Sequence, residues 1–330
     1  MSYNINMTKL NYVETLRGVA ILGVILIHSR LFVESSSPTL QTIVDNGDKG
    51  VQLFMVISGY VTCLAVKNQK LNTPRSIWEF YRKKFIRIIP AFYLAIVVYL
   101  VFIKYQPFSL LATLTTLSFT HGLFPNYINY VVPGGWYLAT QMGFIILFPA
   151  LSRYLKTAKS SWIAFLFIWA TSRFVTRFLP QSEFFYYYLP AQLAIYILGM
   201  MSYHATQARA LPRIILPSLI ILVLVNLAHP TLVAPYVWFG IGFSIILYYL
   251  ATFRPTWHLP LLTKLGHTSY LMYLFHYAVY VVFSPLHLAT IPLFILVTIT
   301  SYLASVLLTP ILTNRPSSKE PSLVTNASTV

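Results

Sequence analysis

Apolar stretches long enough to cross a lipid bilayer recur along the whole of this 330-residue chain. The first includes residues 19–27, which carry no polar side chain. A surface helix of a soluble protein needs a polar face, whereas a helix of about 17–25 apolar residues spans the hydrocarbon core. We therefore predict an all-α polytopic membrane protein with about ten spans, at residues 13–33, 50–67, 86–106, 136–153, 161–179, 187–204, 213–229, 235–252, 267–284 and 290–312.

Composition supports one membrane domain without an appended soluble one. Hydrophobic residues make up 57% of the chain and charged residues 9%, against about 25% charged residues in ordinary soluble domains. We predict a membrane domain at residues 10–314, a cytoplasmic tail at 1–9 and a disordered tail at 315–330. The stretch 108–121 is short and Thr-rich, which favours a re-entrant segment. The single cysteine excludes an internal disulfide.

The positions of Lys and Arg predict the orientation of the spans, because cytoplasmic loops carry an excess of both. The densest basic cluster, residues 67–87, follows the second span and is expected in the cytoplasm. With ten crossings, eighteen of the twenty-three basic residues lie on that side, and so do both termini. The net charge of +16 therefore reflects orientation rather than nucleic-acid binding. The five basic residues left outside are Arg30, Lys49, Lys104, Arg173 and Arg177.

The first span carries a stripe of ionisable residues. His28 follows Arg17 by eleven positions, a turn of roughly 1100° that places both on one helix face, about 16 Å apart along the axis. Glu14 lies close enough to share this face and to pair with Arg17. Ionisable groups inside a membrane are costly and usually functional, so we expect the stripe to line a cavity that water can reach.

Several motifs in series resemble the membrane acyltransferase family 3. They are residues 11–18 with the Arg17…His28 spacing, residues 50–60 with Ser58-Gly59-Tyr60, residues 80–90 with Lys84 and Arg87, Trp136-Tyr137-Leu138, and residues 265–276, which end at His276. The motifs stand in the family's order and cover the chain from about Leu10 to Leu312. The resemblance implies an integral membrane enzyme that moves acetyl or other short acyl groups from cytoplasmic acyl-CoA to a hydroxyl of a surface glycan such as O-antigen or exopolysaccharide.

Three positions depart from the family pattern. Gln141 stands where the family has Glu, and glutamine can neither carry a charge nor act as a base. Asn314-Arg315-Pro316 replaces a Glu before Pro. Lys84 replaces the first Arg of the family's basic pair with Arg87, which removes one bidentate fork. These changes leave the acyl group and acceptor open, together with the alternative of a non-catalytic relative.

The resemblance and the ionisable stripe together suggest catalytic roles. We predict His28 as general base or transient acyl carrier, with a histidine satisfied by neighbouring helices as the alternative. Arg17 would anchor the donor or polarise its carbonyl, or else extend to the membrane surface. Glu14 would hold Arg17 in place.

Further residues are candidates for binding. Lys84 and Arg87, with Arg82 nearby, would hold the phosphates of acetyl-CoA, although a basic cytoplasmic loop also meets the orientation rule. Trp136 and Gln141 would contact the glycan from the outer side. Ser58, Tyr270 and His276 are further substrate-binding candidates. The alternatives are close packing at Ser58-Gly59 and packing of His276 with tyrosine hydroxyls.

The remaining histidines are expected in loops and lack metal-ligand spacing, so no metal is predicted, and no Gly-rich nucleotide loop occurs. The expected partners are a glycan or lipid-linked saccharide, membrane lipid and other enzymes of glycan assembly, in a bacterial inner membrane. A transporter or flippase for a glycan intermediate is the rival prediction from another class.

Overall fold

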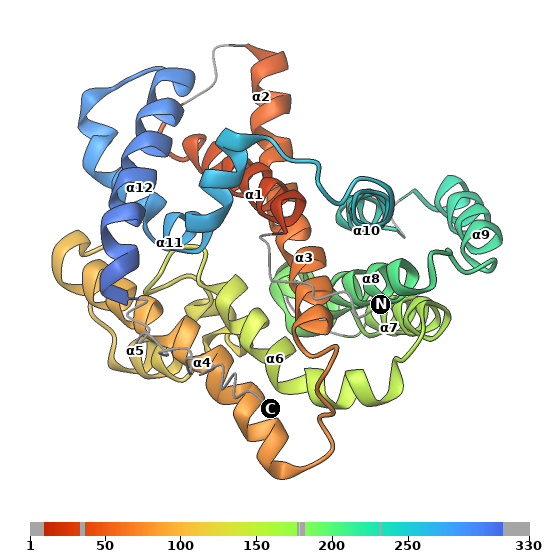
Figure 1. Cartoon of the computed structure of the whole chain (residues 1–330). Helices are drawn as coiled ribbons and strands as arrows, with labels where there is room; N and C mark the ends of the chain where they lie inside the picture. The colour runs from red at the N-terminus through yellow and green to blue at the C-terminus, as the bar shows by residue number, and fades with distance from the viewer. Residues whose placement is uncertain (1–9, 34–36, 177, 179–181, 231–232, 313–330) are drawn as a thin grey trace, which may run out of the picture.

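Helices form all the regular structure in the part of the chain that the computed structural model describes, residues 10–33, 37–176, 178, 182–230 and 233–312 (Figure 1). This confirms the all-α class for those residues; the predicted tails 1–9 and 315–330, and Asn314, lie outside them. Each predicted span contains a long helix. These helices are α1 (Asn11–Ser29), α3 (Lys49–Ala65), α4 (Pro74–Val97), α6 (Trp136–Tyr154), α7 (Ala158–Thr176), α8 (Leu189–Ala208), α9 (Ile215–Ala228), α10 (Pro235–Phe253), α11 (Pro260–Phe283) and α12 (Thr290–Leu312).

Five of the described helices are long and apolar enough to cross a membrane. They are α1, α4 with its π-helical continuation η2 (Val98–Ile103), α10, α11 with the short η6 (Ser284–Leu286), and α12. The outer surface of α12 agrees with contact to lipid. Ile295, Ile299, Leu303 and Leu307 follow one another at four-residue intervals and are all exposed, so they form a continuous apolar stripe on one helix face.

Two helices begin well before the apolar stretch that predicted them. The Thr73 hydroxyl accepts a hydrogen bond from the Ser76 N–H, the Ser76 hydroxyl accepts one from the Thr73 N–H, and Pro74 follows at the first turn. This capping box starts α4 twelve residues ahead of position 86. Pro260 likewise starts α11 early, so His267 lies in a helix and our prediction of a loop there was wrong.

The connections between the long helices contain shorter helical pieces. Helix α5 (Leu110–Leu117) occupies the stretch that we interpreted as re-entrant, and its eight residues reach only about 12 Å. The sequence gave no sign of α2 (Pro38–Asp45), which Ser37 caps, or of the single turns η1 (Asn46–Asp48), η3 (His121–Leu123), η4 (Pro125–Tyr127) and η5 (Ser182–Tyr187). His121 is buried and its Nε2–H donates to the Gly135 carbonyl at 3.0 Å. This bond fixes the turn that precedes α6.

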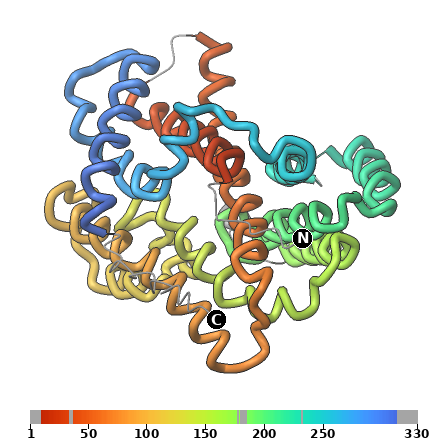
Figure 2. Tube along the Cα trace, viewed as in Figure 1, coloured from red at the N-terminus to blue at the C-terminus, as the bar shows by residue number. Residues whose placement is uncertain are grey.

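Helix α1 lies at the centre of the bundle, packed against α11 and α3 (Figures 1 and 2). Helix α3 packs in turn against α8, and α8 against α7 and α10. Glycines allow the closest crossing. A Cβ atom on Gly18 would overlap the Leu262 carbonyl oxygen, and one on Gly266 would overlap the Glu14 carbonyl oxygen. The backbones of α1 and α11 therefore touch beside Glu14 and Arg17.

Replacing Gly266 with alanine tests the importance of this crossing. Because the new methyl group has no space, we expect Gly266→Ala to lower the free energy of unfolding by about 1–3 kcal/mol. Gly242→Ala in α10 is a matched control, since no atom lies within 4 Å of a Cβ there and alanine favours a helix by up to about 1 kcal/mol. Thermal unfolding of the two detergent-solubilised proteins compares them. Equal midpoints would contradict the close crossing.

Candidate active site

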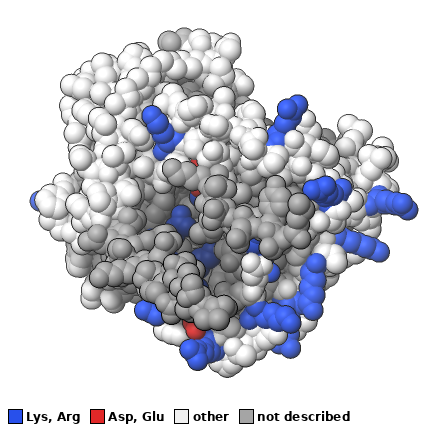
Figure 3. All heavy atoms as spheres, viewed as in Figure 1, with Lys and Arg blue, Asp and Glu red and all other residues white. Residues whose placement is uncertain are grey.

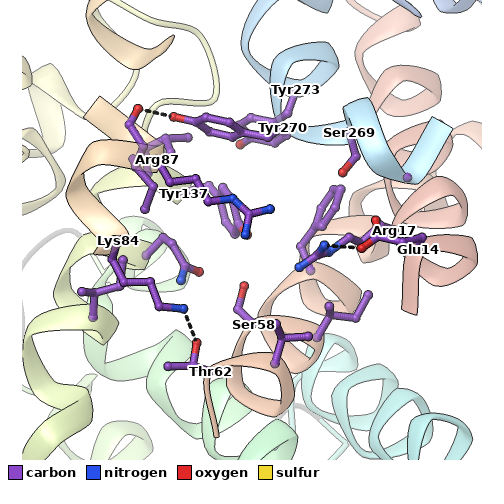
Figure 4. Close-up of a pocket in the computed structure, with 18 of the residues that line it drawn as sticks. Glu14, Arg17, Ser58, Thr62, Lys84, Arg87, Tyr137, Ser269, Tyr270 and Tyr273 are labelled. Carbon is purple, nitrogen blue, oxygen red and sulfur yellow. Dashed lines mark hydrogen bonds and ion pairs between the residues drawn. The ribbon is translucent and has the colours of Figure 1, made fainter. Parts of the chain in front are cut away.

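Side chains from α1, α3, α4, α6 and α11 line one cavity of about 200 Å³ (Figure 4). We call it the Arg17 cavity. Its wall combines cations, hydroxyl groups and aromatic rings with an apolar remainder, and no described strand or long loop contributes to it. The lining residues are Glu14, Arg17, Phe54, Ile57, Ser58, Val61, Thr62, Lys84, Arg87, Ile88, Tyr137, Leu138, Gln141, Ile145, Gly266, His267, Ser269, Tyr270 and Tyr273.

Arg17 and Glu14 form an ion pair at the α1 side of this cavity. Arg17 Nη1 donates to Glu14 Oε1 at 2.8 Å, and both side chains are largely buried. The predicted pairing is confirmed. His267 Nδ1 lies 3.7 Å from the other carboxylate oxygen of Glu14, so α11 also contacts the pair. Glu14 therefore fixes the direction of the Arg17 guanidinium without removing it from the cavity wall.

Lys84 and Arg87 enter the Arg17 cavity from α4, on the side opposite Arg17 (Figure 4). Lys84 Nζ donates to Thr62 Oγ1 at 3.3 Å and lies 5.7 Å from the centre of the Phe80 ring. The two α4 cations and Arg17 face a single lining carboxylate, Glu14, so the cavity has an excess of positive charge. Arg82 is exposed and is not among the lining residues.

Tyrosines of α11 close another side of the cavity. The Tyr270 hydroxyl donates to the Ile88 carbonyl at 2.8 Å, and the Tyr273 hydroxyl donates to the Gly134 carbonyl at 2.7 Å. Tyr270, a predicted substrate contact, thus lines the cavity while its hydroxyl proton is already used. These two bonds tie α11 to α4 and to the turn before α6, which fixes the cavity's width.

The predicted outer pair, Trp136 and Gln141, is divided between two environments. Gln141 lines the Arg17 cavity with the cations, and its Oε1 is buried without a hydrogen-bond partner among the described residues. Trp136 is buried against the rings of Tyr186 and Tyr187, at 5.4 and 5.2 Å between ring centres. Its indole face is therefore covered by tyrosines.

Ser58 lines the Arg17 cavity, while its neighbour Gly59 makes the close helix contact that we considered for the pair. A Cβ on Gly59 would overlap the Tyr196 carbonyl oxygen of α8, and one on Gly199 would overlap the Val56 carbonyl oxygen of α3. The motif therefore combines a cavity hydroxyl with a packing glycine.

His28 is half-buried and lies next to His276 rather than in the wall of the Arg17 cavity. His276 Nε2 is 3.1 Å from His28 Nδ1. Our expectation that Arg17 and His28 line the same cavity is not met by this cavity. Tyr273 lies between the two levels, because it lines the Arg17 cavity and its ring centre is 5.9 Å from that of His276. Packing with tyrosines and contact with His28 therefore coexist at His276.

Hydrogen bonds assign the proton positions of the histidine pair. His276 Nδ1 is 2.8 Å from the Tyr273 carbonyl, and His28 Nδ1 is 2.8 Å from the Val24 carbonyl. A carbonyl oxygen only accepts, so in the neutral rings each Nδ1 carries the proton. His276 Nε2 then presents a lone pair to the His28 Nδ1–H. The remaining lone pair of the pair, on His28 Nε2, is left to accept a proton.

Several cavity residues escaped the prediction from sequence. His267, Ser269 and Tyr273 belong to the 265–276 motif that we quoted, and Tyr137 to the Trp-Tyr-Leu motif, but spacing within one helix does not show which residues meet another helix. The direct contact of His28 with His276 joins positions 248 apart in sequence. No group of three His, Cys, Asp or Glu side chains that could hold a metal occurs among the described residues.

Comparison with known proteins places the chain in a family. The sequence matches a family profile described as an acyltransferase domain over residues 10–310, a range that includes every residue of the Arg17 cavity and the histidine pair. No curated protein and no solved structure gives a significant match. By its matched length and by the motifs quoted above, the chain belongs to the membrane acyltransferase family 3.

Proposed function

We propose that the protein transfers an acetyl or other short acyl group from cytoplasmic acyl-CoA to a hydroxyl of a cell-surface or lipid-linked glycan. The observation that carries the proposal is the Arg17 cavity, where Arg17, Lys84 and Arg87 converge beside the histidine pair in a family of acyltransferases. Coenzyme A carries several negative charges, and cations in a largely buried site bind such a ligand strongly.

The five apolar helices and the family indicate an integral membrane protein. We further propose ten crossings, with both termini in the cytoplasm and the chain in a bacterial inner membrane. The basic connection between α3 and α4 would then face the cytoplasm, where acyl-CoA is made. Lys84 and Arg87 follow this connection directly, which supports a donor that enters from that side.

In the proposed donor complex, the cations and Gln141 have separate tasks. Arg17, held by Glu14, and the pair Lys84 and Arg87 bind phosphate or the thioester oxygen. Gln141 Oε1, buried without a described partner, accepts a hydrogen bond from an amide N–H of the pantetheine arm. Glutamine at this position serves binding and needs no charge, which agrees with an active enzyme despite the departure from the family's Glu.

His28 would act as the base of the transfer. Its Nε2 takes the proton from the acceptor hydroxyl as the hydroxyl oxygen attacks the thioester carbonyl carbon. The C–S bond then breaks, the new ester C–O bond remains, and the proton passes from His28 to the leaving thiolate. Movement of the Tyr273 side chain would connect the Arg17 cavity with His28.

Mass spectrometry of surface glycan from cells with and without the gene tests the function. We expect loss of acyl groups from glycan that is still exported, and restoration by the wild-type gene but not by His28→Ala. Loss of export with normal acylation would instead favour the transporter. Unchanged glycan in both respects would contradict acyl transfer.

The donor-binding part of the proposal predicts a selective effect of the α4 cations. Lys84→Gln with Arg87→Gln should raise the KM for acyl-CoA about 10- to 100-fold, because hydrogen bonds to charged groups contribute about 1.5–3 kcal/mol. Arg82→Gln with Lys83→Gln removes the same charge from exposed neighbours outside the cavity and should change KM little. Equal effects of the two double variants would show a general field instead of a site.

A further inference from the structure

A second cavity, of about 660 Å³, lies beside the first and has a basic lining of its own. Lys67 and Lys70 enter it from the α3–α4 connection, and Arg153 and Lys156 from the end of α6 and the residues after it. We call it the Lys67 cavity. Figure 3 shows Lys and Arg side chains gathered over the part of the surface where these two connections lie in Figure 1. None of the lining residues is acidic.

These four cations are available to a ligand. None of their side chains makes a hydrogen bond or ion pair with another residue in the described part of the chain. His204, in the same wall, has an Nε2 that is buried and without a described partner. An unneutralised group of four cations around a hollow selects a ligand with several negative charges.

The same two helices line both cavities. On α3, Thr62 faces the Arg17 cavity and Cys63 the Lys67 cavity. On α6, Gln141 lines the first and Ser152 the second, a separation of about 16 Å along the helix. A ligand that occupied both would be long and flexible in the middle, polyanionic at the end in the Lys67 cavity, and able to reach Gln141 with the other end.

We propose that the Lys67 cavity binds the 3′-phosphorylated adenosine diphosphate end of the acyl-CoA donor, while the pantetheine arm extends into the Arg17 cavity. The inference rests on the proposed function, because it takes acyl-CoA as the donor. It adds a nucleotide site in which the four cations contact phosphates. A phospholipid headgroup carries phosphate as well, so the experiment must distinguish these two sources.

The test compares two donors with the purified protein in vesicles of neutral lipid. One donor is acetyl-CoA and the other is S-acetyl-pantetheine, which lacks the nucleotide. Changing Lys67, Lys70, Arg153 and Lys156 together to Gln should raise the KM for acetyl-CoA about 10- to 100-fold and leave the KM for S-acetyl-pantetheine unchanged. Adenosine 3′,5′-bisphosphate should inhibit the wild type and lose its effect on the variant.

A matched control removes four exposed cations that line neither cavity, by changing Lys159, Arg213, Arg254 and Lys264 to Gln. This variant should retain the wild-type preference for acetyl-CoA. Equal losses in both variants would overturn the site in favour of a general electrostatic field. An effect that appears only in vesicles with phosphatidylglycerol, and equally for both donors, would assign the cations to lipid and also overturn it.

Direct binding separates failure of this inference from failure of the proposed function. If the wild type transfers no acyl group from either donor, the proposed function fails, yet calorimetry with adenosine 3′,5′-bisphosphate still measures the Lys67 cavity. Binding to the wild type and to the control variant, but not to the Lys67 cavity variant, supports the site. Equal binding to all three proteins excludes it.

Discussion

His28→Asn is expected to lower the kcat of acyl transfer by about 10²–10⁴-fold, the usual contribution of a positioned general base. Asparagine can still donate a hydrogen bond toward the Val24 carbonyl, as His28 Nδ1 does, but it has no lone pair in place of Nε2. The KM for acyl-CoA should stay near its wild-type value, because His28 does not line the Arg17 cavity. Initial rates with purified protein in vesicles measure both constants.

His258→Asn provides a matched control for this prediction. His258 is exposed and its Nδ1 contacts only the nearby Thr256 carbonyl, so its replacement should leave kcat unchanged. If His28→Asn retains kcat within a few-fold while His258→Asn does the same, another group takes the proton. His28 would then be a structural residue of the α1–α11 contact.

His276→Leu should lower kcat on the order of 10²-fold with little change in KM, the size of effect that follows from a reacting group displaced by about 1 Å. His276 is buried, and its Nε2 accepts from the His28 Nδ1–H at 3.1 Å. Leucine removes this acceptor, so the imidazole of His28 loses one of the two bonds that set its orientation. His276 is thus proposed as a positioning residue.

Rescue by glutamine distinguishes positioning from packing. The Oε1 of glutamine can accept the same hydrogen bond, so His276→Gln should recover much of the activity that His276→Leu loses. Thermal unfolding and acyl-CoA binding of both variants provide the comparison for folding. If glutamine fails to restore kcat while both variants remain as stable as the wild type, the hydrogen bond between the histidines has no part in catalysis.

Local sequence patterns predicted much of this protein correctly because they concern single helices. Apolar length located the long helices, since a span must satisfy its backbone within itself. The three-residue spacing of Glu14 and Arg17 predicted their ion pair. Helix starts were less predictable: the apolar stretch marked where α4 could enter lipid, whereas Thr73, Pro74 and Ser76 decided where the helix begins.

The sequence by itself determined the all-α class, the family and the positions of Arg17, His28, Lys84 and Arg87 along their helices. Only the tertiary structure decided which of these groups meet. Periodicity fixes the face of a helix on which a side chain lies, but the crossing of two helices sets what that face contacts. The glycine contact between α1 and α11 brings His276 to His28 and His267 to Glu14. It also leaves Arg17 and His28, on one helix, at two separate levels of the site.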